Sequence, residues 1–166
     1  MDTPILASLY RARTSKVAVA LAVALFAAAV LLSAPALAKF FQGTSGSDTI
    51  VGTDKEDLID ARAGNDRVRA LSGNDTVVLG AGDDIGRGQE GNDVIRGNDG
   101  KDTLYGGPGE DRLSGGKGND TIDTGGDDRR SDEVNCGSGE DTVFVSANDH
   151  SSNNLDLSGC ENVISV

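Results

Sequence analysis

The chain contains no tryptophan, and aromatic residues make up only 4% of its 166 residues. A core or an interface built around large aromatic side chains is therefore not expected. Basic residues are also scarce, with 15 Lys and Arg against 27 Asp and Glu, which gives a net charge of −12. Because nucleic-acid binding depends on clustered Lys and Arg, this balance argues against a nucleic-acid partner.

Sequence markers of common enzyme classes are missing as well. A single histidine, His150, excludes a His-Glu-x-x-His zinc site, and the sequence has no Gly-x-Ser-x-Gly motif of a serine hydrolase. Glycines at 86, 88 and 91 have the spacing of a dinucleotide-binding loop, but no long helix is predicted after them. We therefore expect that the protein is not an enzyme, and we interpret His150 as a solvated loop residue.

The N-terminal segment has the three-part layout of a secretory signal peptide. Three basic residues between positions 11 and 16 precede sixteen uncharged, mostly apolar positions, 17–32, and the stretch 33–38 ends in Ala-x-Ala. An uncleaved membrane anchor is the alternative, but this apolar stretch is shorter than the roughly 20 residues that a spanning helix needs. We predict a signal helix in residues 1–38, cleavage after Ala38, an extracellular protein and no stable membrane anchor after cleavage.

The predicted mature chain, residues 39–166, carries a net charge of −14 and all 23 glycines. Its content of Leu, Ile, Val and Phe is about 20%, a level at which highly charged chains tend to stay disordered. Folding is therefore expected to need a species that neutralises carboxylates.

Aspartate recurs every nine residues from position 48 to position 120, and a twelve-residue unit then precedes a final step of nine. Two residues after nearly every Asp stands an apolar residue, and two residues before most of them stands a glycine. One apolar residue between two mostly polar ones predicts a minimal strand, and Gly and Asn favour tight turns. Two such units form one coil of eighteen residues around a thin, single-layered core. The series comprises Asp48, Asp57, Asp66, Asp75, Asp84, Asp93, Asp102, Asp111, Asp120, Asp132 and Asp141.

The best-formed units, 106–114 and 115–123, read Gly-Gly-Pro-Gly-Glu-Asp-Arg-Leu-Ser and Gly-Gly-Lys-Gly-Asn-Asp-Thr-Ile-Asp. This pattern resembles the nonapeptide repeat of the RTX (repeats-in-toxin, haemolysin-type) calcium-binding family, G-G-x-G-x-D-x-U-x with U apolar. It covers eleven units from Gly43 to Phe144. The resemblance implies an all-β fold, a right-handed parallel β-roll (a β-solenoid) that binds Ca²⁺ between its turns. With residues 39–42 as a short lead before the first unit, it points to a short secreted form without a catalytic domain.

Stacking of the coils explains why Asp and Gly would hold a metal ion. Each unit lies over the unit two places later, so that Asp84, for example, stacks on Asp102. Two carboxylates at one strand spacing repel each other, and Ca²⁺, which takes six to eight oxygen ligands, reverses the sign of that energy. We predict that the eleven Asp bind Ca²⁺ together with backbone carbonyls of the glycine turns, and that binding is coupled to folding. Examples of these glycines are Gly88, Gly97, Gly106 and Gly115.

Several units depart from the motif. Lys, Ala-Arg and Ala-Leu replace glycines at 55, 61–62 and 70–71, and Gly86 replaces the apolar residue of its unit, which predicts a gap in the core. Whether units 52–87 bind metal is therefore open, and an Asp there could instead be a turn residue bonded to local backbone. The tightest sites are expected on Asp93, Asp102, Asp111 and Asp120. In the longer unit, either Asp128 or Asp132 could hold the ligand position.

The repeat ends after Phe144. Apolar residues at 155, 157, 163, 164 and 166 predict one or two short strands that form a C-terminal cap, residues 145–166, behind the β-roll of residues 43–144. Cys136 and Cys160 are the only cysteines, and in an exported chain a disulfide between them is expected. Free thiols or an intermolecular bridge are the alternative.

The sequence thus predicts a secreted protein that binds calcium ions and folds on binding them. Two other functions stay open. The protein could be an extracellular structural or adhesive module whose exposed Arg87, Arg96, Tyr105 and Arg112 contact a protein or cell-surface partner of unknown identity. It could also be an accessory subunit of a secreted enzyme.

Overall fold

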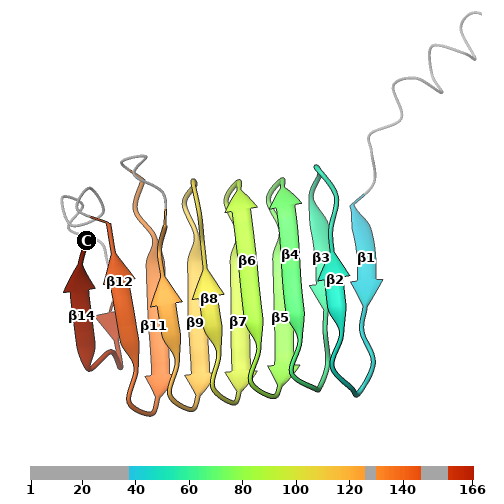
Figure 1. Ribbon diagram of the computed structural model, residues 1–166. Coiled ribbons are helices and arrows are strands. Elements are labelled where there is room, and N and C mark those ends of the chain that lie inside the picture. The colour runs from blue at the N-terminus through green and yellow to red at the C-terminus, as the bar shows by residue number, and fades with distance from the viewer. Residues whose placement is uncertain (1–37, 126–129, 147–156) are drawn as a thin grey trace, which may run out of the picture. The chain divides into compact units, whose positions relative to one another are not determined.

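The computed structural model describes residues 38–125, 130–146 and 157–166. Within these residues the chain forms an all-β parallel solenoid of about six turns (Figure 1). The predicted signal helix, Asp128 and His150 lie outside them, and Ala38 is exposed directly before the first strand. The described residues contain no helix that is long and apolar enough to cross a membrane.

The strands are short and alternate between two seven-stranded sheets, with odd-numbered strands in sheet A and even-numbered strands in sheet B. All pairings within the sheets are parallel, and the register places most residues opposite those eighteen positions later, as with Val77 and Ile95. The strands are β1 (Lys39–Gln42), β2 (Thr49–Val51), β3 (Asp57–Asp60), β4 (Arg67–Ser72), β5 (Thr76–Ala81), β6 (Ile85–Glu90), β7 (Val94–Asp99), β8 (Thr103–Tyr105), β9 (Arg112–Lys117), β10 (Thr121–Asp123), β11 (Glu133–Ser138), β12 (Thr142–Val145), β13 (Leu157–Ser158) and β14 (Asn162–Ser165).

From the third unit onward, the second residue of each unit turns the chain with a left-handed backbone, whereas Thr44 and Thr53 in the first two units do not. Gly116 has φ of 116°, and a β-carbon there would collide with the carbonyl oxygen of Asn98 in the neighbouring coil. Where the motif departs from glycine, the turn keeps this conformation: Arg62 has φ of 77° and Leu71 has φ of 88°. A left-handed conformation costs a non-glycine residue roughly 1–2 kcal/mol, so the imperfect units keep their shape at the expense of stability.

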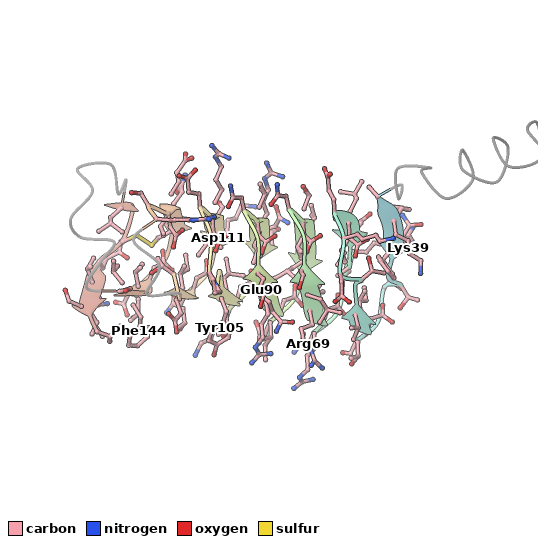
Figure 2. All side chains as sticks on the ribbon, turned by 90° about the horizontal axis from the view of Figure 1, so that it is seen from above. Lys39, Arg69, Glu90, Tyr105, Asp111 and Phe144 are labelled. Atoms are coloured by element: carbon pink, nitrogen blue, oxygen red, sulfur yellow. A yellow bond between two sulfur atoms is a disulfide. The ribbon has the colours of Figure 1, made fainter. Side chains whose placement is uncertain are left out.

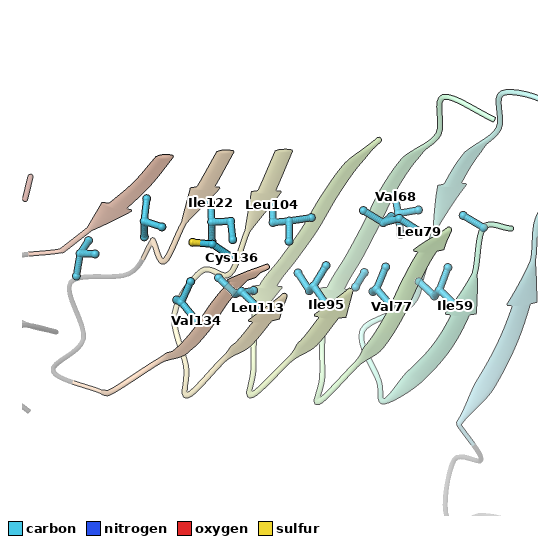
Figure 3. Close-up of a cluster of buried hydrophobic side chains, with 14 residues drawn as sticks. Ile59, Val68, Val77, Leu79, Ile95, Leu104, Leu113, Ile122, Val134 and Cys136 are labelled. Carbon is cyan, nitrogen blue, oxygen red and sulfur yellow. The ribbon is translucent and has the colours of Figure 1, made fainter. Parts of the chain in front are cut away.

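The core is built from two sets of inward side chains (Figure 3). The apolar residues two positions after the Asp residues are buried as predicted, from Ile59 in β3 to Val143 in β12. A second set comes from the first residue of several units and is equally buried: Ala61, Ala70, Leu79, Cys136 and Val145. The core is therefore thicker than the single layer that the repeat predicts.

The predicted gap at Gly86 is wrong, and Leu79 is the reason. A β-carbon on Gly86 would lie 3.1 Å from Leu79 Cδ1 and 3.1 Å from Ile95 Cγ2. Leu79 stands where the motif has its first glycine, and its side chain is fully buried in the space that the missing apolar residue would occupy. One departure from the motif therefore compensates the other.

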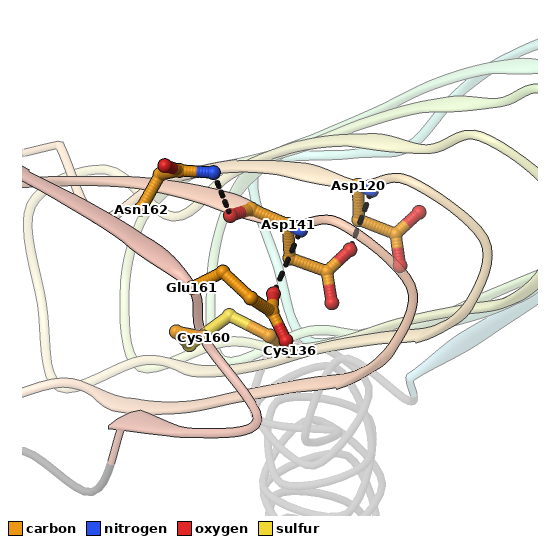
Figure 4. Close-up of a disulfide and its surroundings, with 6 residues drawn as sticks. All are labelled: Asp120, Cys136, Asp141, Cys160, Glu161 and Asn162. Atoms are coloured by element: carbon orange, nitrogen blue, oxygen red, sulfur yellow. Dashed lines mark hydrogen bonds between the residues drawn. A yellow bond between two sulfur atoms is a disulfide. The ribbon is translucent and has the colours of Figure 1, made fainter.

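The C-terminal strands extend both sheets by a further coil. β13 pairs with β11, and β14 pairs with β12. The predicted disulfide between Cys136 and Cys160 is present, with an S–S distance of 1.99 Å (Figure 4). Val163, opposite the buried Val143, keeps 42% of its surface exposed. Among the described residues, the predicted cap thus lengthens the solenoid, and the inward-facing Val163 of its last strand stays partly exposed to solvent.

Candidate metal centre

The predicted Asp residues form two ladders along the turns. In each step the backbone N–H of one Asp donates to Oδ1 of the Asp in the next coil, over 2.7–3.0 Å. This confirms the predicted stacking, including that of Asp84 on Asp102. The first ladder contains Asp48, Asp66, Asp84, Asp102, Asp120 and Asp141, and the second contains Asp57, Asp75, Asp93, Asp111 and Asp132.

The first ladder extends into the last described coil. Asp141 N–H donates to Glu161 Oε2 over 2.9 Å, so that Glu161 is the last member of the first ladder (Figure 4). Sequence reasoning missed it, although Glu161-Asn162-Val163 repeats the spacing of an acid and an apolar residue two positions later. In the longer unit, Asp132 occupies the ladder position, because it accepts from Asp111 N–H over 2.8 Å.

Threonines bind the second carboxylate oxygen of the first Asp in each ladder. Thr44 donates to Asp48 Oδ2 from its backbone N–H over 2.6 Å and from its hydroxyl over 2.9 Å. Thr53 donates to Asp57 Oδ2 from the same two groups over the same distances. The motif has its second glycine at these two positions, and a glycine has no side chain to donate. The threonine hydroxyls therefore add a hydrogen bond to Oδ2 that a glycine could not make.

Deeper in the solenoid, Oδ2 is buried and accepts no hydrogen bond from a described residue. This holds for Asp66, Asp75, Asp84, Asp93, Asp102, Asp120 and Asp141. A buried carboxylate oxygen without a donor is costly unless it takes up a proton or a cation. These buried Oδ2 atoms are therefore the strongest indication that the folded chain binds a cation.

Glycine and a backbone carbonyl lie beside several of these oxygens. A β-carbon on Gly97 would collide with Asp102 Oδ2 and would lie 2.5 Å from the Gly115 carbonyl oxygen. Gly88 has the same relation to Asp93 and to the carbonyl oxygen of Gly106. The missing β-carbon thus leaves a space on which carboxylate and carbonyl oxygens from successive coils converge. The predicted glycines Gly88, Gly97, Gly106 and Gly115 all stand beside the Asp of their own unit in this way.

The imperfect units lack this glycine. Ala61, Ala70 and Leu79 begin the units of Asp66, Asp75 and Asp84, and their side chains belong to the core. Their carboxylates keep the ladder hydrogen bonds, but the space beside Oδ2 is lined differently. The predicted ligands therefore fall into two classes. Asp66, Asp75 and Asp84 have an alanine or leucine at the start of their unit, whereas Asp93, Asp102, Asp111 and Asp120, in the best-formed units, have a glycine there.

Burial shifts the titration of the ladder carboxyls. Desolvation raises the pKa of Asp102 to about 7 and the pKa of Asp75 and of Asp93 to about 6. The backbone N–H bonds of the ladder oppose this shift, whereas neighbouring ladder carboxylates add to it at Asp75 and Asp102. The same causes raise the pKa of Asp84 and Asp120. Without a cation, the folded state therefore disfavours the charged form of these groups.

The donor set fits Ca²⁺ better than a transition metal. The described residues contain no cluster of three or more His, Cys, Asp or Glu side chains that could hold an ion. Backbone carbonyl oxygens lie beside the ladder carboxylates, and both are hard donors of the kind that Ca²⁺ takes in flexible geometry. Asp48 and Asp57, whose Oδ2 atoms are already bonded to threonines, fit this role least.

The exposed residues proposed for adhesion lie on two different sheets. Arg87 in β6 stacks on the ring of Tyr105 in β8, 4.7 Å from its centroid, in sheet B. Figure 2 shows Tyr105 pointing outward from the solenoid. Arg96 and Arg112 belong to β7 and β9 of sheet A, where Arg112 forms an ion pair with Glu133 over 2.9 Å. These four residues therefore do not make one surface.

Comparison with family models identifies the repeat. No curated protein matches the chain. Residues 42–77, 78–113 and 105–129 match the RTX calcium-binding nonapeptide repeat, in a form with four copies, and together span more than half of the sequence. This repeat is a structural calcium-binding motif and not a catalytic one. The matched residues include the ladder positions from Asp48 to Asp120 and the glycines beside them, and the chain belongs to the RTX calcium-binding nonapeptide repeat family.

Proposed function

We propose that the protein is an exported calcium-ion-binding β-roll whose folding is coupled to Ca²⁺. The observation that carries this function is the row of buried Oδ2 atoms without hydrogen-bond donors, beside converging backbone carbonyls. Bound Ca²⁺ would supply positive charge to these oxygens. The residues that would hold it best are Asp93, Asp102, Asp111 and Asp120, with carbonyl oxygens from the glycine turns.

Coupled folding is supported by the cost of the metal-free ladders. The mature chain has few apolar residues for its charge, and burial raises the pKa of Asp75 and Asp102, so we expect their ionised forms to oppose folding near neutral pH. A cation that binds only the folded roll would offset this cost by mass action. An affinity in the range of roughly 10⁻⁴–10⁻³ M would suit an extracellular calcium module.

Export rests on the sequence of residues 1–38. Cleavage after Ala38 would release a chain that begins at the first residue of β1. Expression of the full chain, followed by mass spectrometry of the secreted product, tests this step. A product that begins at Lys39 is expected, and a chain that keeps residues 1–38 in the membrane fraction would contradict export by cleavage.

The central experiment is far-UV circular dichroism of the mature chain, titrated with Ca²⁺ and separately with Mg²⁺, beside calorimetry of calcium uptake. We expect a coil-to-β transition with Ca²⁺ and none with Mg²⁺. A β-rich spectrum that is unchanged by Ca²⁺ while calorimetry detects binding would refute coupled folding. An absence of calcium uptake would refute the function itself.

Adhesion is a second candidate, and the outer face of sheet B favours it. Arg67, Arg69 and Arg87 lie there on neighbouring strands, and none forms an ion pair with a described acid. Three unpaired arginines beside Tyr105 are unexpected on so acidic a chain, and they could contact an anionic surface. Replacing Arg69 and Arg87 with serine should abolish surface attachment while sparing calcium uptake if adhesion is the function.

A further inference from the structure

Both ends of the described solenoid carry apolar side chains at exposed positions of their terminal strands. At the N-terminal end, Val51 of β2 is 43% exposed and Phe40 of β1 is 56% exposed. At the C-terminal end, Val163 and Ile164 of β14 are each 42% exposed. Within residues 38–125, 130–146 and 157–166, the terminal strands of both sheets pair on only one side.

These terminal strands lack the usual protection of sheet edges. Soluble proteins blunt exposed edges with charged residues, proline or bulges, because an unpaired strand is a template for another chain. β2 (Thr49–Val51) and β14 (Asn162–Ser165) contain no charged residue and no proline. The disulfide of Cys136 and Cys160 lies directly before β14 and holds the last coil in place. A fixed edge can pair with another strand at a lower entropic cost than a frayed one.

The two ends also match each other in register. Each sheet has seven strands, so both sheets end together, with β1 and β2 at one end and β13 and β14 at the other (Figure 1). If a second copy continued the same stacking, its β2 would lie beside β14, with Ile164 opposite Val51 and Val163 opposite Ile50. Leu157 of β13 would likewise lie opposite Phe41 of the second copy. Apolar side chains would meet at all three positions.

The first ladder has complementary ends as well. Within it, each Asp Oδ1 from Asp66 onward accepts from the backbone N–H of the preceding coil. Asp48 begins the ladder, and no described residue donates to its Oδ1. Glu161 ends the ladder, with its backbone N–H in the position from which every earlier member donates. The N–H of Glu161 could therefore donate to Asp48 Oδ1 of a second copy.

We propose that the mature protein associates end to end, with the β13–β14 end of one molecule on the β1–β2 end of a second copy. The junction is heterologous, and it continues the parallel stacking by translation along the solenoid, so it builds an open chain of molecules and not a closed ring. The acidic charge of the molecule disfavours association side by side. The proposal takes the mature chain to begin at Lys39, after the cleavage proposed above.

Sedimentation velocity of the secreted mature chain in saturating Ca²⁺, over a range of protein concentrations, tests the proposal. We expect species that grow with concentration. Val51→Asp or Ile164→Asp should weaken association roughly 5-fold, because each replaces an outward apolar side chain that would pair with another across the junction by a carboxylate. Val78→Asp is the matched control, because Val78 also faces outward but lies in β5, inside sheet A. A wild-type chain that stays monomeric while its circular dichroism is that of the folded roll would overturn the proposal.

A mixing experiment tests the head-to-tail arrangement directly. Val51→Asp keeps an intact C-terminal end, and Ile164→Asp keeps an intact N-terminal end. An equimolar mixture of the two variants should form more dimer than either variant alone, because only the junction between the two different variants is unweakened. Equal weakening by the control Val78→Asp, or a mixture that associates no better than the separate variants, would show that the contact lies elsewhere.

Discussion

Replacing Asp102 with Asn should stabilise the metal-free roll and weaken calcium binding. Burial raises the pKa of Asp102 from 3.8 to about 7, so at pH values above 7 the ionised carboxylate opposes folding by up to ~4 kcal/mol, at about 1.4 kcal/mol for each unit of pKa. Asn keeps the carbonyl oxygen that accepts from Asp84 N–H and removes the charge. Its NH₂ group can donate toward the Gly115 carbonyl, which converges on the same space.

Asp57→Asn is the matched control, because Thr53 already binds the Oδ2 atom of Asp57. An amide nitrogen in this position would face the Thr53 N–H, and the lost hydrogen bonds should destabilise the roll by about 1–3 kcal/mol without changing the number of bound ions. Urea unfolding in the presence of a chelator measures the first effect, and calorimetry of calcium uptake measures the second. Asp102→Asn with a calcium stoichiometry equal to that of the wild type, or with a less stable metal-free state, would refute the reasoning.

Three further predictions follow from the turns and ladders. Gly97→Ala should remove calcium binding at Asp102, because the added β-carbon would occupy the space beside Oδ2. Gly46→Ala is the control: a β-carbon there would have only Thr44 Oγ1 nearby, at 3.9 Å, so calcium uptake measured by calorimetry should not change. Arg62→Gly should raise the free energy of unfolding in urea by about 1 kcal/mol, because glycine adopts φ of 77° without strain; no gain would show that the turn is unstrained. Acidification should stabilise the metal-free roll, because the folded-state pKa of Asp102 and of its neighbours in the ladders lies above the unfolded value of 3.8. The free energy of unfolding should rise as the pH falls from about 7 to about 4. The melting temperature in the presence of a chelator measures this change, and a melting temperature that falls over the same range would contradict the prediction.

The nine-residue period of Asp was sufficient to predict the sheets, the stacking of coils and both ladders. This succeeded because each coil repeats the same contacts, so that one period fixes which residues lie opposite each other. The best-formed units, around Asp102 and Asp120, also have the glycines that the motif predicts. Asp132 joined its ladder despite the longer unit, because the extra residues leave the parallel pairing of β9 and β11 intact.

The period could not predict the contacts made by residues that depart from the motif. Leu79 and Gly86 both look like defects in the repeat, yet the side chain of Leu79 fills the space above Gly86. Thr44 and Thr53 replace glycines, and their hydroxyls bind the carboxylates that would otherwise need a cation. Glu161 lies beyond the regular period, and only its hydrogen bond to Asp141 shows its place in the ladder. These effects depend on three-dimensional neighbours and not on sequence spacing.

The ladder hydrogen bonds join residues only eighteen to twenty-one positions apart in sequence. Each coil therefore depends mainly on its two neighbours, so stability behaves approximately as a one-dimensional chain of nearest-neighbour terms. A defect in a central coil should divide the solenoid into two separately melting halves, whereas the same defect in the first coil should only shorten it. For a chain that emerges from a membrane end first, this locality also allows each coil to form on its predecessor before the rest of the protein has arrived.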